Sequence, residues 1–178
     1  MPDVTLDGEG YQYSRGAVDA ALCSVLLDHA ELALAHALEL DLQASKNLFG
    51  EIRAPLFRRD LKLSLEPPVV AALAAVARTQ HGLLTAAVGD AAVLCECSVI
   101  SSDPGADAQP AHCDTSYQGA ADPNTTIARL VTVFVALQDI KAEMGPTIFY
   151  PRTHTQDMHH QLWLQPKSEV SVYQQNLL

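Results

Sequence analysis

Residues 126–140 carry the strongest strand pattern in the chain, because β-branched or large apolar side chains follow one another almost without a break. If this segment is extended, two apolar faces result. One face carries Val131, Val133, Val135 and Leu137, and the other carries Leu130, Thr132, Phe134 and Ala136. A strand that is apolar on both faces is buried between two layers. The segment therefore predicts a layered β core, with other structure packed on each side of it.

The first half of the chain has a different periodicity. Residues 17–40 lack glycine and proline and are rich in alanine and leucine, which favours a helix. An apolar stripe follows one side of this helix. Its members are Leu22, Leu26, Ala30, Ala33 and Ala37. A loop with Gly50, Pro55 and the arginines at positions 53, 58 and 59 is expected next. A second helix is predicted to begin at Pro67 and Pro68 and to run toward Gly82 or Gly89.

Strand patterns replace helix patterns after Gly89 and Asp90. Residues 91–101 are apolar and β-branched, residues 102–110 are dense in turn formers, and residues 147–150 and 169–173 predict two more short strands. Helices followed by strands indicate an α+β fold with a β-sandwich or barrel at its core. A length of 178 residues suits a single domain, in which residues 1–90 supply helices and residues 91–178 supply the β core.

Charge and composition argue against a nucleic-acid-binding protein and against a membrane-spanning one. Eleven Lys and Arg residues stand against 21 Asp and Glu residues, for a formal net charge of −10, so the basic footprint of a nucleic-acid binder is absent from the sequence. The longest strongly apolar stretch, residues 67–77, is shorter than the ~20 residues of a membrane span. The acidic start predicts no signal peptide, and the four cysteines form no CxxC pair. We therefore expect a cytoplasmic protein with no nucleic-acid partner and no membrane span.

The segment QPAHCDTSY, residues 109–117, holds the residues best suited to chemistry. In an extended chain His112 and Asp114 project from one face and Cys113 from the other. An imidazole and a carboxylate placed in this way supply two of the three ligands of the 2-His-1-carboxylate triad that holds non-haem iron. The alternative is structural, with the histidine hydrogen-bonded to the nearby aspartate at the end of a loop. The His-x-Asp pattern alone leaves both interpretations open.

The neighbouring segments add a resemblance to a known family. A turn-rich loop leads into His112, the long strand pattern follows, and MGPTIFYPRTHT occupies residues 144–155. This order and spacing, over roughly residues 91–160, resembles the phytanoyl-CoA dioxygenase family of Fe(II)/2-oxoglutarate-dependent oxygenases. Arg152 stands where the family more often has glycine. The resemblance implies a double-stranded β-helix (jelly roll), here incomplete, with the helices of residues 1–90 packed against it.

The resemblance also implies a cofactor set and a reaction. His112 and Asp114 match the family's first two iron ligands, and Fe(II) and 2-oxoglutarate would serve hydroxylation of a small-molecule or acyl substrate. Phe134 and Tyr117 match positions that line the cosubstrate pocket in the family. Each of these aromatic residues also has a plain structural interpretation, since an aromatic side chain in a strand is usually part of a core.

The third iron ligand has no clear match. The family's distal histidine and its 2-oxoglutarate arginine follow the segment equivalent to residues 145–154. After His154 this sequence has only His159 and His160, and no arginine follows Arg152. Three interpretations stay open. The chain is a fragment that lacks the C-terminal part, as its strand-like ending suggests; or His154 is the third ligand and Arg152 binds a carboxylate; or the protein is a degenerate oxygenase. The last would be a binding module, able to self-associate through an exposed sheet edge.

Overall fold

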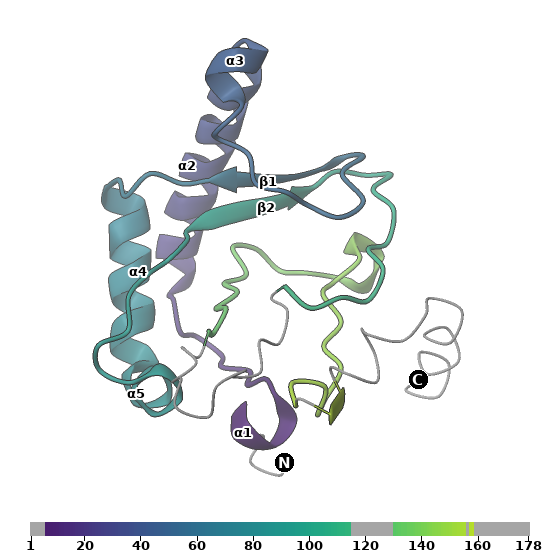
Figure 1. Ribbon diagram of the computed structural model, residues 1–178. Helices are drawn as coiled ribbons and strands as arrows, with labels where there is room; N and C mark the ends of the chain where they lie inside the picture. The colour runs from purple at the N-terminus through teal and green to yellow at the C-terminus, as the bar shows by residue number, and fades with distance from the viewer. Residues whose placement is uncertain (1–5, 115–129, 156, 159–178) are drawn as a thin grey trace. The chain divides into compact units, whose positions relative to one another are not determined.

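The computed structural model describes residues 6–114, 130–155 and 157–158 (Figure 1). Helices and one small antiparallel sheet make up these residues, which confirms a mixed α+β class. The helices are α1 (Leu6–Glu9), α2 (Ala20–Glu39), α3 (Leu42–Ser45), α4 (Pro67–Thr79), α5 (His81–Val88) and the 3-10 helix η1 (Ala142–Met144), and the strands are β1 (Arg58–Lys62) and β2 (Ser98–Ser102).

The chain divides into two compact units. The larger unit comprises residues 16–110 and 130–146 and contains α2 to α5, the sheet and η1. The described part of the smaller unit comprises residues 6–15, 111–114, 147–155 and 157–158.

Helix α2 forms where the apolar stripe predicts it. The side chain of Asp19 caps its first turn, with Oδ1 accepting a hydrogen bond from Leu22 N at 2.9 Å. Leu26, Ala30 and Ala37 of the predicted stripe are buried. By length and composition alone α2 could also cross a membrane, as could α4 and α5 taken together, which are bent by 80° at their junction.

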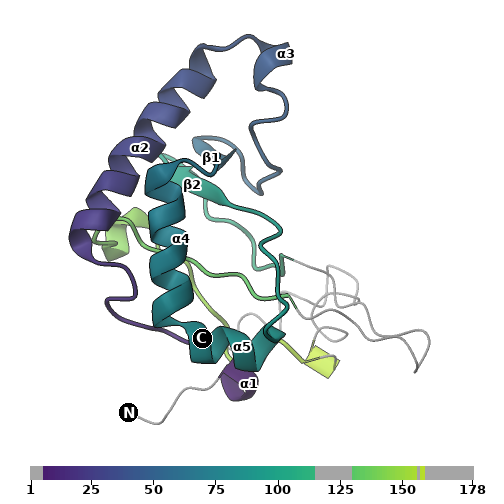
Figure 2. The same cartoon turned by 90° about the vertical axis from the view of Figure 1, so that its left-hand side faces the viewer.

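Helices α4 and α5 together occupy the second predicted helical region. Pro67 and Pro68 open α4, where a missing backbone N–H costs nothing. The helix breaks at Gln80, and α5 ends at Val88, followed by Gly89, whose φ of 81° suits glycine. The predicted helix is therefore confirmed as two helices, of which α4 packs alongside α2 (Figure 2).

The core of the larger unit lies between α2 and α4. One cluster joins Val18 to Ala75 and Val76, and a second joins Leu26 to Val69 and Ala72. The partly buried side chain of Val135 packs on the first cluster and that of Leu137 on the second. Two residues of the predicted central strand thus contact the helices directly.

Strands β1 and β2 pair antiparallel, from Arg58 opposite Ser102 to Lys62 opposite Ser98. The predicted loop at Arg58 and Arg59 is therefore wrong at these two residues. The sequence RRDLK hides this strand because four of its five side chains are charged, and Leu61, which is 2% exposed, is its one buried residue. Only the end of the predicted strand at residues 91–101 is in β2, since residues 91–97 are not in a strand.

The strongest strand prediction is wrong within residues 130–140, which the structure describes without a strand. The expected alternation persists only in part. Val131, Val135 and Leu137 are partly buried, but Val133 of the same predicted face is 47% exposed. Leu130 and Phe134 of the other face are more than half exposed. Most side chains of the segment are exposed, so it is not the two-sided strand that its sequence indicates. A strand also needs a neighbour to complete its hydrogen-bond ladder, and residue pattern alone does not supply one.

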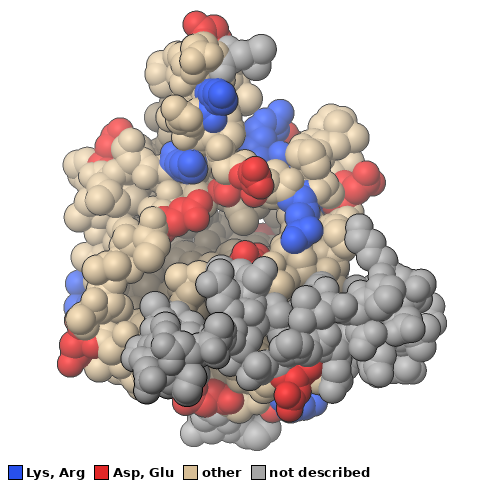
Figure 3. Space-filling view, viewed as in Figure 1, with Lys and Arg blue, Asp and Glu red and all other residues tan. Residues whose placement is uncertain are grey.

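The short strand predicted at residues 147–150 is absent from the structure, and the one at residues 169–173 lies outside the described residues. Within the described ranges β1 and β2 are the only strands, so a jelly roll is not confirmed. Positive and negative side chains are interspersed over the described residues on the face drawn in Figure 3. This distribution agrees with the sequence, in which no basic cluster outweighs the acidic residues.

Candidate metal site

His112 and Asp114 lie close together in the segment that follows the loop after β2. Their side chains approach to 3.5 Å between Nε2 of His112 and Oδ1 of Asp114. The histidine side chain is 25% exposed and the aspartate side chain 56% exposed, so both can be reached from solvent. Cys113 between them is partly buried. The two predicted ligands therefore turn toward one another, as both the metal and the structural interpretation require.

The separation of these two atoms suits a shared metal ion. Donors about 2.1 Å from a divalent metal and at right angles lie about 3 Å apart. The 3.5 Å between Nε2 and Oδ1 is close to that value, so a small side-chain adjustment would place both on one ion. Imidazole with carboxylate is also the donor set of non-haem iron. His112 and Asp114 fit two adjacent positions of such a site.

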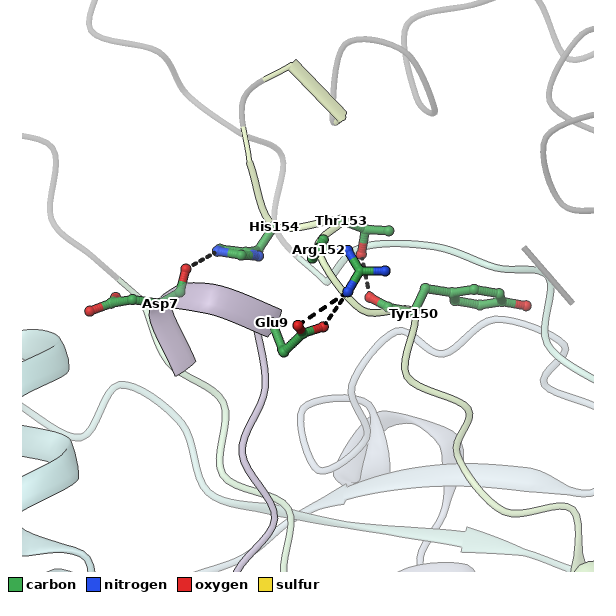
Figure 4. Close-up of polar contacts among 6 residues, drawn as sticks. All are labelled: Asp7, Glu9, Tyr150, Arg152, Thr153 and His154. Atoms are coloured by element: carbon green, nitrogen blue, oxygen red, sulfur yellow. Dashed lines mark hydrogen bonds and ion pairs between the residues drawn. The ribbon is translucent and has the colours of Figure 1, made fainter. Parts of the chain in front are cut away.

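The structure supplies no third ligand among the residues it describes. No group of three His, Cys, Asp or Glu side chains in that part of the chain is arranged to hold a metal. His154, the candidate third ligand, instead has Nε2 at 3.1 Å from the backbone oxygen of Asp7 (Figure 4). His154 therefore belongs to no such group of three among the described residues.

Arg152 occupies a backbone conformation that explains why glycine would suit its position. Its φ is 61°, in the left-handed region that glycine adopts without cost and other residues avoid. Its backbone N–H donates to the oxygen of Glu9 at 2.8 Å. Its Nη1 donates to both carboxylate oxygens of Glu9, at 2.9 and 3.1 Å (Figure 4). Residue 9 thus holds the arginine through main chain and side chain together.

Further contacts tie residues 6–11 to residues 149–154. The rings of Tyr11 and Phe149 stack with centroids 5.5 Å apart. A Cβ on Gly10, where φ is 83°, would lie 2.7 Å from Cγ of His154, so only glycine allows this approach. Sequence reasoning missed the role of residues 7–11 altogether. No local pattern reveals it, because the two segments are some 140 positions apart.

Of the two aromatic residues expected to line a cosubstrate pocket, the structure describes only Phe134. Phe134 is 52% exposed, on a segment that forms no strand, and Tyr117 lies outside the described residues. Phe134 is therefore not the buried core aromatic that its alternative interpretation requires. Their assignment to a cosubstrate pocket stays a prediction.

The sequence model of the family described as Phytanoyl-CoA dioxygenase (PhyH) matches residues 8–170. This chain belongs to the phytanoyl-CoA dioxygenase family. The match confirms the resemblance seen in the sequence and extends it over the helical first half. Neither the curated proteins nor the solved structures yield a match.

Membership in the phytanoyl-CoA dioxygenase family gives the His112–Asp114 pair its context. The matched span contains the pair and the turn at Arg152. It also contains helices α2, α4 and α5, and all of α1 except its first two residues. Oxygenases of this kind use an open face on the iron for their chemistry, which a two- or three-ligand site on the protein leaves available. The family therefore supports an oxygenase-like function for this chain.

Proposed function

We propose that this chain is an Fe(II)- and 2-oxoglutarate-dependent oxygenase in which His112 and Asp114 hold the iron. The observation that carries the proposal is the 3.5 Å approach of His112 Nε2 to Asp114 Oδ1, inside the span that matches the family. The third ligand would come from outside the residues that the structure describes, because those residues offer no cluster of three.

Each side chain of the pair has a distinct task in this proposal. His112 would bind through the neutral Nε2, so its other ring nitrogen would carry the proton. Asp114 would contribute one negative charge and offset part of the charge of the ion. When bound, Fe(II) together with 2-oxoglutarate would activate O₂ for hydroxylation of a C–H bond. The protein would bind, orient and exclude water around the reactants.

The finer features of the proposal follow the family. The β core would be a jelly roll, here incomplete, within one domain in which residues 1–90, helical apart from β1, pack against residues 91–178. Phe134 and Tyr117 would line the 2-oxoglutarate pocket. The substrate would be a small molecule or an acyl compound, in a cytoplasmic protein without a membrane span or a nucleic-acid partner.

Turnover of 2-oxoglutarate tests the proposal. The purified chain, supplied with Fe(II), ascorbate and 2-oxoglutarate in air, should release succinate even without its substrate. The variants His112→Ala and Asp114→Ala should fall to the background of protein-free iron. His36→Ala is the matched control, because His36 is exposed on α2. Equal succinate release by all four proteins would reject the metal assignment.

A second candidate function is a non-catalytic binding module. The favouring observation is that Arg152 and His154, the two described residues that were candidates to complete the site, both bond to residues 7–9. Such a module would self-associate through an uncovered sheet edge. Background succinate release by the wild-type protein, together with a concentration-dependent dimer in sizing chromatography, would support this function over the oxygenase.

A further inference from the structure

The guanidinium of Arg152 is only partly used by the contacts that the structure shows. Among the described residues Nη1 is its only nitrogen with a hydrogen-bond partner, and this partner is the Glu9 carboxylate. The Nε and Nη2 edge is the side of the fork that takes a carboxylate through two parallel hydrogen bonds. The arginine side chain is 68% exposed, so this chemistry is open to solvent.

Glu9 is held in place independently of its charge. Its backbone oxygen accepts from the Arg152 N–H at 2.8 Å, and its side chain is 31% exposed. On either side of it along the chain, Asp7 O contacts His154 Nε2 and Tyr11 stacks on Phe149. The carboxylate is therefore presented to the guanidinium by a fixed segment, as a bound ligand would be (Figure 4).

We propose that Arg152 is a binding site for small carboxylate anions and that Glu9 is its internal occupant. Residues 6–11 act as a strap whose acidic side chain competes with a free carboxylate for the guanidinium. The site lies in the smaller unit and needs no metal, so the proposal is independent of the oxygenase function.

The left-handed backbone at Arg152 adds an independent argument. A non-glycine residue held at φ 61° is strained, and such strain persists where the surroundings hold it in place. Glycine would satisfy the backbone at this turn without strain. The side chain is therefore the feature that distinguishes this position, and its observed partner is a carboxylate.

An NMR titration with sodium succinate tests the site. The metal-free protein, with EDTA present, is titrated while the side-chain Nε–Hε resonance of Arg152 is followed, and sodium chloride at the same ionic strength corrects for screening. Glu9→Gln should bind succinate about two- to fivefold more tightly than wild type, the gain expected when a competing exposed ion pair is removed. The control Glu31→Gln removes the same charge from the exposed face of α2 and should bind as wild type does.

Two further variants make the result decisive. Arg152→Gln should abolish the succinate-dependent shifts of neighbouring amides. Gly10→Ala should act as Glu9→Gln does, because its new Cβ pushes the strap away from His154. The proposal is overturned if Glu9→Gln and wild type bind succinate equally, or if succinate binding survives in Arg152→Gln. Since no iron is present, failure here leaves the oxygenase proposal untouched.

Discussion

Arg152 donates from Nη1 to both carboxylate oxygens of Glu9, across a sequence separation of 143 residues. This ion pair joins the first described helix to the turn that carries His154. It also accompanies a left-handed φ at the arginine, so side-chain pairing and backbone strain act at one residue and can be separated by substitution.

Arg152→Gly and Arg152→Val separate the two effects. Both variants lose the ion pair with Glu9, but only glycine adopts φ near 61° without strain, whereas a β-branched residue there is an outlier. We expect the valine variant to have a free energy of unfolding lower by about 1 kcal/mol than the glycine variant. Urea denaturation measures the difference. Equal stability of the two variants would show that the backbone at this position relaxes.

The cap of α2 gives a second prediction. Asp19→Ala removes the hydrogen bond from Leu22 N to Oδ1 and should lower the free energy of unfolding by about 1 kcal/mol. Asp28→Ala, on the exposed face of the same helix, is the matched control and should change it by less than about 0.5 kcal/mol. A cap variant as stable as this control would place the start of the helix elsewhere.

The contact between α2 and α4 gives a third prediction, which concerns the free energy of unfolding. Leu26 is 7% exposed and packs on Val69 and Ala72, so Leu26→Ala should cost about 2–4 kcal/mol. Leu32 of the same helix is 71% exposed, and Leu32→Ala should be nearly neutral. Thermal unfolding of the two variants compares them. A larger loss for Leu32→Ala would mean that the opposite face of α2 is the packed one.

The cysteines give a prediction about pH. Burial raises the pKa of the Cys97 thiol, whereas Cys95 is exposed. Since the thiolate is the form that reacts, iodoacetamide should label Cys95 faster than Cys97 at pH 8, as followed by mass spectrometry. Labelling of Cys97 at the rate of Cys95 would contradict its burial.

The same shift has a consequence for stability. Because the pKa of Cys97 is higher in the folded chain, the unfolded chain loses this proton first. The protonated Cys97 thiol therefore makes its full contribution to the free energy of unfolding below the unfolded-state pKa of about 8.5. This contribution is lost as the pH rises through the folded-state pKa.

The helices could be predicted because their signals are local. The stripe through Leu26 and the two prolines that open α4 act within a few turns of chain. Strand β1 could not be predicted, because it forms through pairing with β2 and burial of Leu61. Both depend on residues about 40 positions away in the sequence. Residues 130–140 show the opposite case, because a strong local strand pattern neither ensures a hydrogen-bond ladder nor fixes which side chains are covered, as the 47% exposed Val133 shows.

In the candidate site too, contacts between residues close in sequence could be predicted and contacts between distant segments could not. His112 and Asp114 are two positions apart, so the sequence alone indicates that they can meet, and their side chains approach to 3.5 Å. The contacts of Arg152 and His154 with residues 7–9 depend on distant parts of the chain, and nothing in the sequence points to them. The third iron ligand could not be predicted for the same reason, because long-range folding decides which side chain meets the His112–Asp114 pair.

Anaerobic titration of the purified chain with Fe(II), in the presence and absence of 2-oxoglutarate, tests the central claim most directly. The proposal predicts a visible charge-transfer band that needs both components and disappears in His112→Ala, while His36→Ala keeps it. Absence of the band in the wild-type chain, or its survival in His112→Ala, would contradict the assignment of His112 and Asp114 as iron ligands.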